Sequence, residues 1–530
     1  MSQRLSQRLD NLLQRQPDAL RDIHRGVEKE GLRADSEGRI SQTDHPQALG
    51  STLTHPSITT DYSEALLELI TPVENSIDNM LTDLRDTHKF VQANLPDGEV
   101  FWAGSMPCRL EGDPSIRIAE YGSSNVGTIK HVYRKGLSYR YGRIMQSIAG
   151  VHFNFSMGDT FWEALHQLED GDQSLQDFKS DTYFSLIRNF RRWSWLLMYL
   201  FGASPVLDKS FLNGRQHQLE EMGPDTLGLP YATSLRMSGL GYQNNAQSSL
   251  KICFNHLNTY LSTLFEATHV PYPDYEKIGI RVDGEYRQLN TNLLQIENEY
   301  YNSIRPKRVA ASGEKPIQAL QRRGVEYIEV RCLDLNPFSP IGIETEKAHF
   351  LDVFLLTCLL DESPMITDEE CGLIEQNFAA TVERGRDPQC YLTRIENKDS
   401  RSDYRQVLLR DWGYELLEKM EKVAELMVES HGDERYKEAL KHAHATLTDS
   451  HLTPSAKLLT AMGRGRKGYA DWILDMSQRH HQQLLDEALT PEQMQQAQRL
   501  SEQSWLDERA LREADSQSFE DYLRQYLTYS

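Results

Sequence analysis

Two glutamates of the segment RGVEKEGLR (25–33) have the spacing of a metal-binding pair. If the segment is a strand, Glu28 and Glu30 lie on one face, because strand side chains alternate. Two carboxylates side by side repel each other and gain nothing from folding alone. A divalent cation between them would offset that repulsion, since carboxylate oxygens are common ligands of such ions. The segment therefore raises the hypothesis of a cation site.

Three more segments carry polar side chains at alternate positions. These are Asp61 and Glu68 in TTDYSEALLELITP (59–72), His152 and Asn154 in GVHFNFS (150–156), and Tyr327, Glu329 and Arg331 in VEYIEVRCLDL (325–335). The first segment is Leu-rich in its middle, so both a helix and a strand remain open there. Any one of these patterns is also typical of a solvated strand face. Together, acids and one histidine repeated on the polar faces predict a buried site for Mg²⁺ or Mn²⁺ rather than zinc.

Basic side chains gather in two segments of an otherwise acidic chain, YRKGLSYRYGR (133–143) and IRPKR (304–308). In the second segment Arg305, Lys307 and Arg308 are candidates for contacts to phosphate groups, and a solvated loop is an equal alternative. Arg331 lies two residues from Glu329 and therefore on the same strand face. A guanidinium beside a metal-binding carboxylate is suited to a phosphoryl group.

The composition excludes several classes of protein. The 530-residue chain has 78 Asp and Glu against 57 Lys and Arg, a formal net charge of −21, which argues against a general nucleic-acid binder. Its six cysteines have neither zinc-site spacing nor the density of a disulfide framework. The N-terminus is unlike a signal peptide, and the apolar run WSWLLMYLF (193–201) is too short to cross a bilayer. We expect a soluble cytoplasmic enzyme without nucleic-acid or membrane partners.

One apparent nucleotide motif is rejected. GRGRKG (463–468) matches GxGxxG, but it follows a segment with helical spacing and carries three basic side chains. A dinucleotide-binding loop follows a strand and is small and neutral. The chain also contains no GxxxxGK[ST] motif. Any use of ATP would therefore need a different fold.

The elements that must position the candidate residues form a strand-rich part followed by a helical part. Strands are predicted for the polar-alternating segments and for LLQIENEYY (293–301), and helices for 76–95, 344–362 and 434–447. WSWLLMYLF is expected to be a buried helix that ends at Gly202. The half-polar strands favour an α+β fold whose sheet has one face open to a cavity. We expect one catalytic domain over 1–530, strand-bearing over about 20–343 and mainly helical over about 344–530.

The chain resembles glutamate–cysteine ligase of the bacterial single-chain type, nearly from end to end. The resemblance rests on long motifs, which are HRGVEKEGLR, HPQALGSTLTHPSITTDYSEALLELITP, SMPC, YGSSNVG, YLFGASP, LPYATSLRMSGLGY, LQIENEYYNSIRPKR and GVEYIEVRCLDLNPFSPIG. It implies a fold related to glutamine synthetase, in which a curved antiparallel sheet forms a funnel wrapped by helices. The implied reaction joins the γ-carboxylate of glutamate to the amine of cysteine through a γ-glutamyl phosphate, with ATP as co-substrate. That reaction is the first step of glutathione synthesis.

The resemblance also implies roles for individual residues. Two or three Mg²⁺ ions, with Mn²⁺ as an alternative, are implied at Glu28, Glu30, Asp61, Glu68, His152 and Glu329. Arg134 and Arg331 match basic residues suited to the transferring phosphoryl group and the tetrahedral intermediate. Arg236 matches the residue expected to bind the glutamate carboxylate. The implied cysteine pocket consists of Tyr62, Tyr133, Leu137, Gln146, Tyr242 and Tyr301.

Two departures and two alternatives accompany this assignment. Tyr62 stands where the family has Phe, and Gly31 stands where it has Thr, which suggests a looser loop; both bear on acceptor affinity. One alternative keeps the fold and joins glutamate to a different amine. The other is an inactive metal-binding scaffold, which the intact acidic set argues against, because a scaffold has no use for paired buried charges. The resemblance further implies a monomer that could be inhibited by glutathione.

Overall fold

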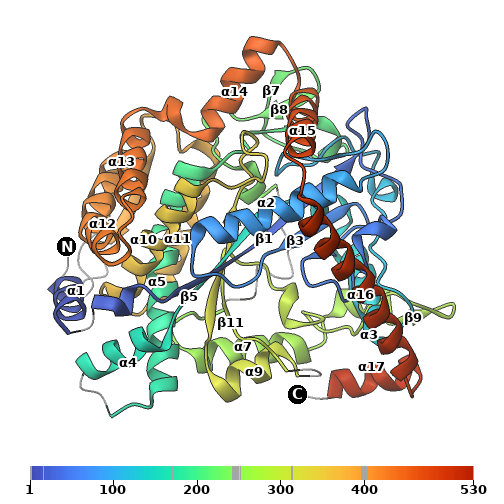
Figure 1. The fold of residues 1–530 in the computed structure, drawn as a ribbon, viewed down its shortest axis with the longest axis horizontal. Helices are drawn as coiled ribbons and strands as arrows, with labels where there is room; N and C mark the ends of the chain where they lie inside the picture. Colours follow the sequence, from blue (N-terminus) through green and yellow to red (C-terminus); the bar gives the residue numbers. More distant parts are fainter. Residues whose placement is uncertain are drawn as a thin grey trace.

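The computed structural model describes residues 3–15, 17–169, 172–240, 250, 252–311, 314–395 and 404–528. Its centre is a seven-stranded sheet in the order β11-β12-β5-β1-β3-β2, with β4 paired to β1 (Figure 1). The strands are β1 (Ile23–Ala34), β2 (Ile58–Thr60), β3 (Leu66–Ile70), β4 (Val100–Phe101), β5 (Val151–Met157), β11 (Ile304–Lys307) and β12 (Tyr327–Leu333). All of their pairings are antiparallel, so the predicted α+β class is confirmed.

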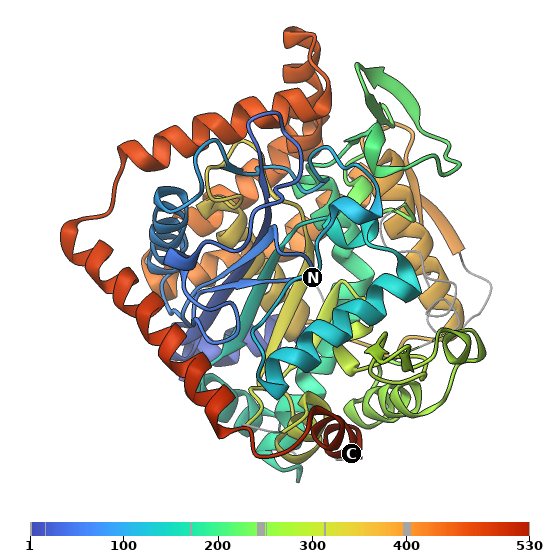
Figure 2. The same cartoon turned by 90° about the vertical axis from the view of Figure 1, so that its right-hand side faces the viewer.

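Helices wrap this sheet, as Figures 1 and 2 show. They are α1 (Gln3–Arg15), α2 (Ile77–Ala93), α3 (Asn125–Tyr141), α4 (Asp159–Leu168), α5 (Leu175–Phe201), α7 (Leu257–His269), α8 (Pro273–Ile278), α9 (Pro316–Arg323), α10 (Thr345–Leu360), α11 (Asp368–Arg384), α12 (Leu409–His431), α13 (Arg435–Thr448), α14 (Pro454–Gly465), α15 (Tyr469–Asp486), α16 (Pro491–Ala514) and α17 (Phe519–Thr528). In the part of the chain that the structure describes, none of them has the length and apolar character needed to cross a bilayer.

The described residues also form three smaller antiparallel sheets. They are β6 (Val206–Asp208) with β7 (Glu220–Gly223) and β8 (Thr226–Gly228), β9 (Arg281–Val282) with β10 (Glu285–Tyr286), and β13 (Tyr391–Ile395) with β14 (Tyr404–Leu408). The β13–β14 hairpin interrupts the part predicted to be mainly helical. The helices predicted at 76–95, 344–362 and 434–447 correspond to α2, α10 and α13.

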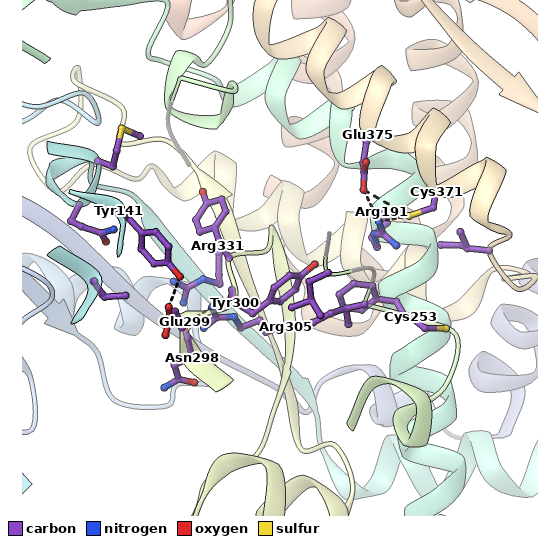
Figure 3. Close-up of a pocket in the computed structure, with 18 of the residues that line it drawn as sticks. Tyr141, Arg191, Cys253, Asn298, Glu299, Tyr300, Arg305, Arg331, Cys371 and Glu375 are labelled. Carbon is purple, nitrogen blue, oxygen red and sulfur yellow. Dashed lines mark hydrogen bonds and ion pairs between the residues drawn. The ribbon is translucent and has the colours of Figure 1, made fainter. Parts of the chain in front are cut away.

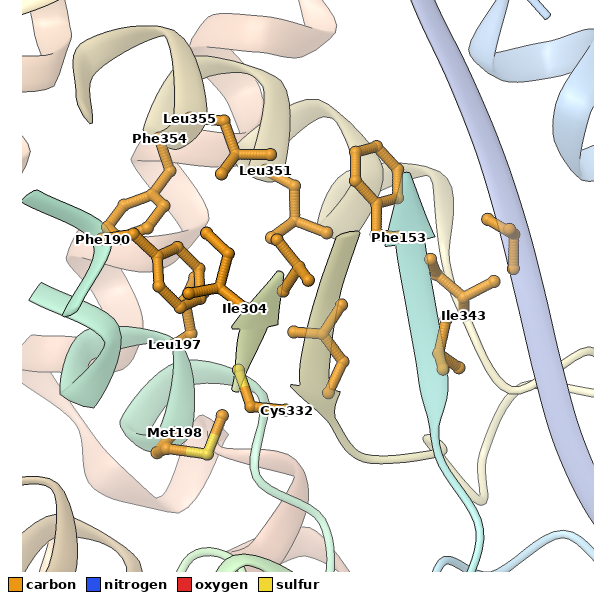
Figure 4. Packing of buried hydrophobic residues seen from close by; sticks show 14 of the residues in the cluster. Phe153, Phe190, Leu197, Met198, Ile304, Cys332, Ile343, Leu351, Phe354 and Leu355 are labelled. Carbon is orange, nitrogen blue, oxygen red and sulfur yellow. The ribbon is translucent and has the colours of Figure 1, made fainter. Parts of the chain in front are cut away.

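One face of the sheet packs on helices α5 and α10. Phe153, Ile304 and Cys332, from three neighbouring strands, meet Phe190 of α5 and Phe354 of α10 in a continuous apolar layer (Figure 4). WSWLLMYLF forms the last turns of α5, and the N–H of Gly202 closes that helix on the carbonyl of Met198. Because every second residue of each strand packs into this apolar layer, the polar residues between them lie on the opposite face of the sheet.

The strand predicted for 293–301 is wrong. That segment contains a single 3₁₀ turn at Glu297–Glu299. Its backbone groups make hydrogen bonds to side chains and not to a neighbouring strand. The Gln295 N–H donates to Glu299 Oε2 at 2.6 Å, and the Gln295 carbonyl accepts from Asn290 Nδ2 at 2.9 Å. Such side-chain-to-backbone bonds compete with sheet pairing, and alternation of residue types does not reveal them.

The expectation of a looser loop at Gly31 is also wrong, because Gly31 lies within β1. It shares the face of Lys29, away from the acidic residues, and the Lys29 ammonium sits 3.6 Å from the centre of the Phe101 ring. A Cβ at position 31 would lie 2.6 Å from the Phe101 ring and 3.0 Å from Lys29 Nζ. The glycine therefore provides space for this cation–aromatic contact.

Buried His55 is expected to make stability fall in acid. Its Nδ1 accepts the N–H groups of Ser57 at 3.1 Å and Ile58 at 3.0 Å, and burial lowers its pKa from 6.5 to about 4. The unfolded chain binds the proton more readily, so the contribution of His55 is complete above pH 6.5 and is lost as the pH falls toward 4. At pH 5 the loss is about 1–2 kcal/mol.

The measurement is thermal unfolding of wild type and His55→Asn at pH 7 and pH 5, since Asn can accept the same bonds without titrating. The variant should lose less stability between the two pH values. His45, whose pKa burial also lowers to about 4, is present in both proteins and cancels in the comparison. Equal losses in the two proteins would contradict the assignment.

Candidate active site

The strand register brings the predicted acidic residues into one row. Glu28 of β1 lies opposite His152 of β5, and Glu30 lies opposite Glu68 of β3. On the other side of β5, Asn154 lies opposite Glu329 of β12. These polar residues occupy the face opposite the apolar layer of Figure 4. Four neighbouring strands thus contribute oxygen and nitrogen ligands to a single surface. The segment 59–72, left open between helix and strand, is strand at β2 and β3.

His152 lies between the two glutamates of β1. Its Nδ1 is 3.1 Å from Glu28 Oε2, and its Nε2 is 3.5 Å from Glu30 Oε1. Asn154 Nδ2 donates to the other oxygen of Glu28 at 3.0 Å. Among the described residues, two groups have ligand atoms within 4.8 Å of one another, Glu28–His152–Glu329 and Glu30–Glu68–His152. The row therefore offers two adjacent positions for cations that share one histidine.

The two halves of this row differ in charge. Burial raises the pKa of Glu68 well above its usual value, and repulsion from Glu28 and Asp61 raises it further. Burial likewise raises the pKa of Glu30. Burial also opposes ionisation of Glu329, yet Lys307 and Arg331 hold the pKa of that carboxyl well below its usual range. The Glu68 half thus has uncompensated negative charge, which fits divalent cations, whereas the Glu329 half already has cationic partners.

Strand β11 adds the positive charges next to this row. Lys307 Nζ lies 3.3 Å from Glu329 Oε1, and Arg331 Nη1 of β12 lies 3.1 Å from Oε2. Arg305 is buried on the same face and donates to the carbonyls of Asn298 and Tyr300. IRPKR is therefore an edge strand rather than a solvated loop, a position that tolerates its central proline.

Arg308 lies away from this group. Its Nη1 donates to the backbone carbonyls of Arg323 at 2.5 Å and Gly324 at 3.2 Å, beyond the end of β11. Strand alternation also turns it away from the face that Arg305 and Lys307 share. Of the three candidate phosphate contacts, only Arg305 and Lys307 lie with the acidic row.

A cavity of about 950 Å³ opens beside the row (Figure 3). Ten of the predicted site residues line it, which are Glu30, Asp61, Tyr62, Tyr133, Arg134, Leu137, Gln146, Tyr301, Arg305 and Arg331. Figure 3 shows Arg331, Arg305 and Tyr300 along its middle, with Arg191 and Cys371 at the far end. The predicted residue Tyr242 lies outside the described residues. The cavity is large enough for several small substrates at once.

Arg236 is buried behind the row. Its Nη2 donates to the Arg331 carbonyl at 3.1 Å, and its Nη1 lies 3.7 Å from the Asp334 carboxylate. A Cβ at Gly150 would come within 2.1 Å of this guanidinium, so only glycine allows the contact. The carboxylate of Asp334 also accepts from Ser204 Oγ at 2.7 Å and Ser234 Oγ at 3.0 Å. The arginine is thus held in one orientation.

Helix α3 forms the wall opposite the acidic row. Arg134 of α3 donates from Nε to the carbonyl of Asp61 and from Nη1 to that of Lys130 at 3.0 Å. Its guanidinium lies 4.6 Å from the centre of the Tyr121 ring. Tyr62 is 1% exposed, and its hydroxyl lies beside the Ser138 side chain. Burial raises the pKa of this hydroxyl.

The sequence prediction missed some residues of the site. Glu299, Tyr300 and Asp334 lie inside motifs that carry the family resemblance but were given no role, whereas Arg191 and Cys253 lie outside every motif. Asn154 was visible in the alternation of GVHFNFS but was not assigned a role. The others come from loops and helices far apart in the sequence, and only the fold brings them together.

Comparisons with known proteins give the family of this chain. Residues 9–381 match the glutamate–cysteine ligase family. The chain is 64% identical to the glutamate–cysteine ligase of Hahella chejuensis over 529 residues, 100% of both chains. It is 48% identical to that of Pseudomonas entomophila, covering 99% of this chain and 97% of the relative.

A solved structure agrees with these relatives. The crystal structure of glutamate–cysteine ligase from Francisella tularensis, in complex with AMP, superposes with a TM-score of 0.89 at 38% identity. The match covers 96% of this chain and 97% of that one. The chain belongs to the glutamate–cysteine ligase family. This family uses ATP to join the γ-carboxylate of glutamate to the amine of cysteine, the first step of glutathione biosynthesis. The resemblance seen in the sequence is confirmed.

Proposed function

We propose that this chain carries out the family reaction with the acidic row as its Mg²⁺ site and the cavity as its substrate site. The observation that carries the proposal is the row Glu28–His152–Glu329 and Glu30–Glu68, flanked by Arg331 and open to the cavity. Asp61 lies at the cavity edge, where its charge adds to the repulsion on Glu68. Two or three Mg²⁺ ions, or Mn²⁺, fit this excess of negative charge. When bound they would neutralise the phosphate oxygens so that two anionic reactants can meet.

Besides the metal ions, basic side chains supply positive charge that stabilises the transferring phosphoryl group. An oxygen of the glutamate γ-carboxylate attacks the γ-phosphorus of ATP, and ADP leaves. Arg331 and Lys307 lie against Glu329, where they would contact a phosphoryl group bound at the acidic row. The cysteine amine then attacks the acyl carbon, loses a proton and expels phosphate. Arg134, held against the Asp61 carbonyl on the opposite wall, is positioned to stabilise the tetrahedral oxyanion.

The two amino acids are bound by different groups. Arg236, which lies behind the acidic row and outside the cavity lining, is the residue that we propose binds the α-carboxylate of glutamate, and the Asp334 carboxylate 3.7 Å away orients its guanidinium. Cysteine lies among Tyr62, Tyr133, Leu137, Gln146 and Tyr301, largely apolar surfaces that suit a thiol. We also propose a single catalytic domain that acts as a cytoplasmic monomer and is inhibited by glutathione. One hydrophobic core that reaches from α1 to α15 supports the single domain, and the family resemblance supports the rest.

The test is phosphate release with Mg²⁺, ATP, glutamate and cysteine, with each component omitted in turn. Release that requires both amino acids supports the proposal. Glutamate-dependent release with another amine, and none with cysteine, would mean a γ-glutamyl ligase of different acceptor specificity. No release under any condition, from a protein with a native melting transition, would support the scaffold alternative.

Acceptor selectivity provides a sharper prediction at Tyr62. The nucleophile is the amine, so 2-aminobutyrate, whose methyl resembles the thiol in size, should be turned over well. Serine must give up a hydrated hydroxyl to an apolar wall, and its kcat/KM should be roughly 10- to 200-fold lower. The Tyr62 hydroxyl, which a phenylalanine would lack, can pair with the serine hydroxyl and narrow this gap. Tyr62→Phe should therefore widen it.

The measurement is kcat/KM for the three acceptors with wild type, Tyr62→Phe and the control Tyr139→Phe. Tyr139 belongs to the same helix, α3, but is 51% exposed, so its replacement should leave all ratios unchanged. If 2-aminobutyrate is rejected as firmly as serine, the site recognises sulfur itself and this description of the pocket is wrong.

A further inference from the structure

We propose that the C-terminal strap, defined here as residues 491–528 and consisting of α16 and α17, sets the position of the acceptor wall. Leu523 and Asp515 are its positioning residues. The inference rests on the proposed function, in which α3 carries part of the cysteine pocket. Figures 1 and 2 show the strap in red, running along the outside of the molecule and ending beside α3.

The first contact is apolar. Leu523 of α17 is 5% exposed and packs with Ile129 and Val132 of α3 and with Leu289, in a cluster separate from the main core. Tyr133 packs against the same cluster and also lines the cavity. One side of the tyrosine ring therefore contacts the strap cluster while the residue forms part of the acceptor pocket. If Leu523 were shortened, the cavity left beside Ile129 and Val132 would allow α3 to move slightly.

The second contact is at the beginning of α3. The Asp515 carboxylate accepts the N–H of Asn125 at 2.7 Å, and the Gln517 carbonyl accepts from Asn125 Nδ2 at 3.1 Å. Ser124 caps the same turn by accepting the Gly127 N–H. A carboxylate at a helix N-terminus is favourable both as a hydrogen-bond acceptor and with the helix dipole. Asp515 thus anchors the end of α3 that precedes Tyr133 and Arg134.

The third contact holds the segment that leads to Asp61. Ser504 Oγ of α16 accepts the Ser51 N–H at 2.8 Å, and its carbonyl accepts from Thr54 Oγ1 at 2.5 Å. Gly50 has φ of +82°, and a Cβ there would lie 2.5 Å from Ser504 Oγ. The carbonyl of Asp61 in turn receives the Arg134 side chain. The strap therefore contacts both segments that meet at the acceptor wall.

The rest of the strap is attached less deeply, through partly buried Met494 and Ala497 at the edge of the main core and a hydrogen bond from Trp505 Nε1 to the Gln47 carbonyl at 3.0 Å. Along α16 only Ser501, Ser504 and Glu508 are buried, and on α17 only Leu523. Ser504 and Leu523 make contacts described above, and the ideal Cβ of Gly122, just before α3, would lie 2.5 Å from Glu508 Oε1. Because the α17 contact lies in its own small cluster, weakening it leaves the main core intact. The effect should therefore appear at the acceptor site more than in global stability.

The experiment compares full-length wild type with Leu523→Ala and Asp515→Asn. Each variant should raise the KM for cysteine by roughly three- to tenfold, because the cysteine pocket is displaced but none of its side chains is removed. A factor of ten corresponds to about 1.4 kcal/mol of binding free energy. The KM for glutamate should stay within about twofold, because Arg236 is held by elements that the strap does not touch. The melting temperature should change little. Leu511→Ala, at an α16 position that is 39% exposed, is the matched control and should behave as wild type.

Two results would overturn the inference. One is an unchanged KM for cysteine in both variants. The other is a parallel rise in the KM for cysteine and for glutamate, which would indicate general loosening. Leu523→Met, which refills the cluster, should restore the wild-type KM for cysteine. Failure of the proposed function is recognised separately, because wild type itself would then show no cysteine-dependent phosphate release.

Discussion

Replacing either Glu68 or Glu329 by Gln is expected to lower kcat by roughly 10²- to 10³-fold or more, while the two changes move the stability of the metal-free protein in opposite directions. Glu68 is surrounded by Glu28, Asp61 and Glu30, which together with burial raise its pKa well above normal. Removing its charge relieves repulsion and should raise the melting temperature in EDTA.

Glu329 is in the opposite situation. Lys307 and Arg331 both lie within 3.3 Å of its carboxylate, and its side chain is 1% exposed. Glu329→Gln leaves these two cations without their anion, so the melting temperature in EDTA should fall. Breaking a buried ion pair by removing one partner costs about 3–5 kcal/mol, and the retained amide oxygen should reduce that cost.

Both variants should lose roughly 10²- to 10³-fold or more in kcat, because a ligand of the charge-neutralising ions is removed. Both should also lose the rise in melting temperature that Mg²⁺ gives wild type. Glu326→Gln is the matched control, since this glutamate lies just before β12 with its side chain 44% exposed. Activity like that of wild type in both variants at saturating Mg²⁺ would refute the metal assignment.

Arg331→Lys is expected to lower kcat by roughly 10²- to 10³-fold with little change in the KM for ATP. Burial opposes the charge of Arg331, but Glu329 and Glu30 raise its pKa, so the guanidinium stays charged. Lysine keeps that charge and loses the planar fork that can hold two oxygens of a phosphoryl group. The deficit should be greatest where negative charge is greatest, in the transition state.

The control for this change is Arg308→Lys, directly after β11, the strand that pairs with β12. Arg308 is bonded to the carbonyls of Arg323 and Gly324, away from the acidic row, and its replacement should leave kcat and the KM for ATP near wild type. A rise in the KM for ATP with Arg308→Lys would indicate that Arg308 contacts the nucleotide. A rise in the KM for ATP alone with Arg331→Lys would make Arg331 a ground-state binding residue.

The sequence by itself determined which side chains of each strand could form a site. Glu28 with Glu30, His152 with Asn154, and Glu329 with Arg331 follow from the two-residue period of a strand, which is a local property of the backbone. Their apolar neighbours, such as Phe153, follow from the same period and mark the face that α5 and α10 cover. The long motifs likewise determined the family.

The tertiary structure decided how these faces come together. Residues 66–70 are strand β3 rather than helix because β3 pairs with β1 and places Glu68 opposite Glu30, a contact between segments more than 30 residues apart. Residues 293–301 do not form a strand, because the side chains of Glu299 and Asn290 make hydrogen bonds to the backbone of Gln295 in place of a neighbouring strand. Register, the position of His152 between two glutamates, and the anchoring of α3 by Asp515 all depend on long-range pairing. Local residue preferences carry no information about such pairing, because its free energy arises only when distant segments meet.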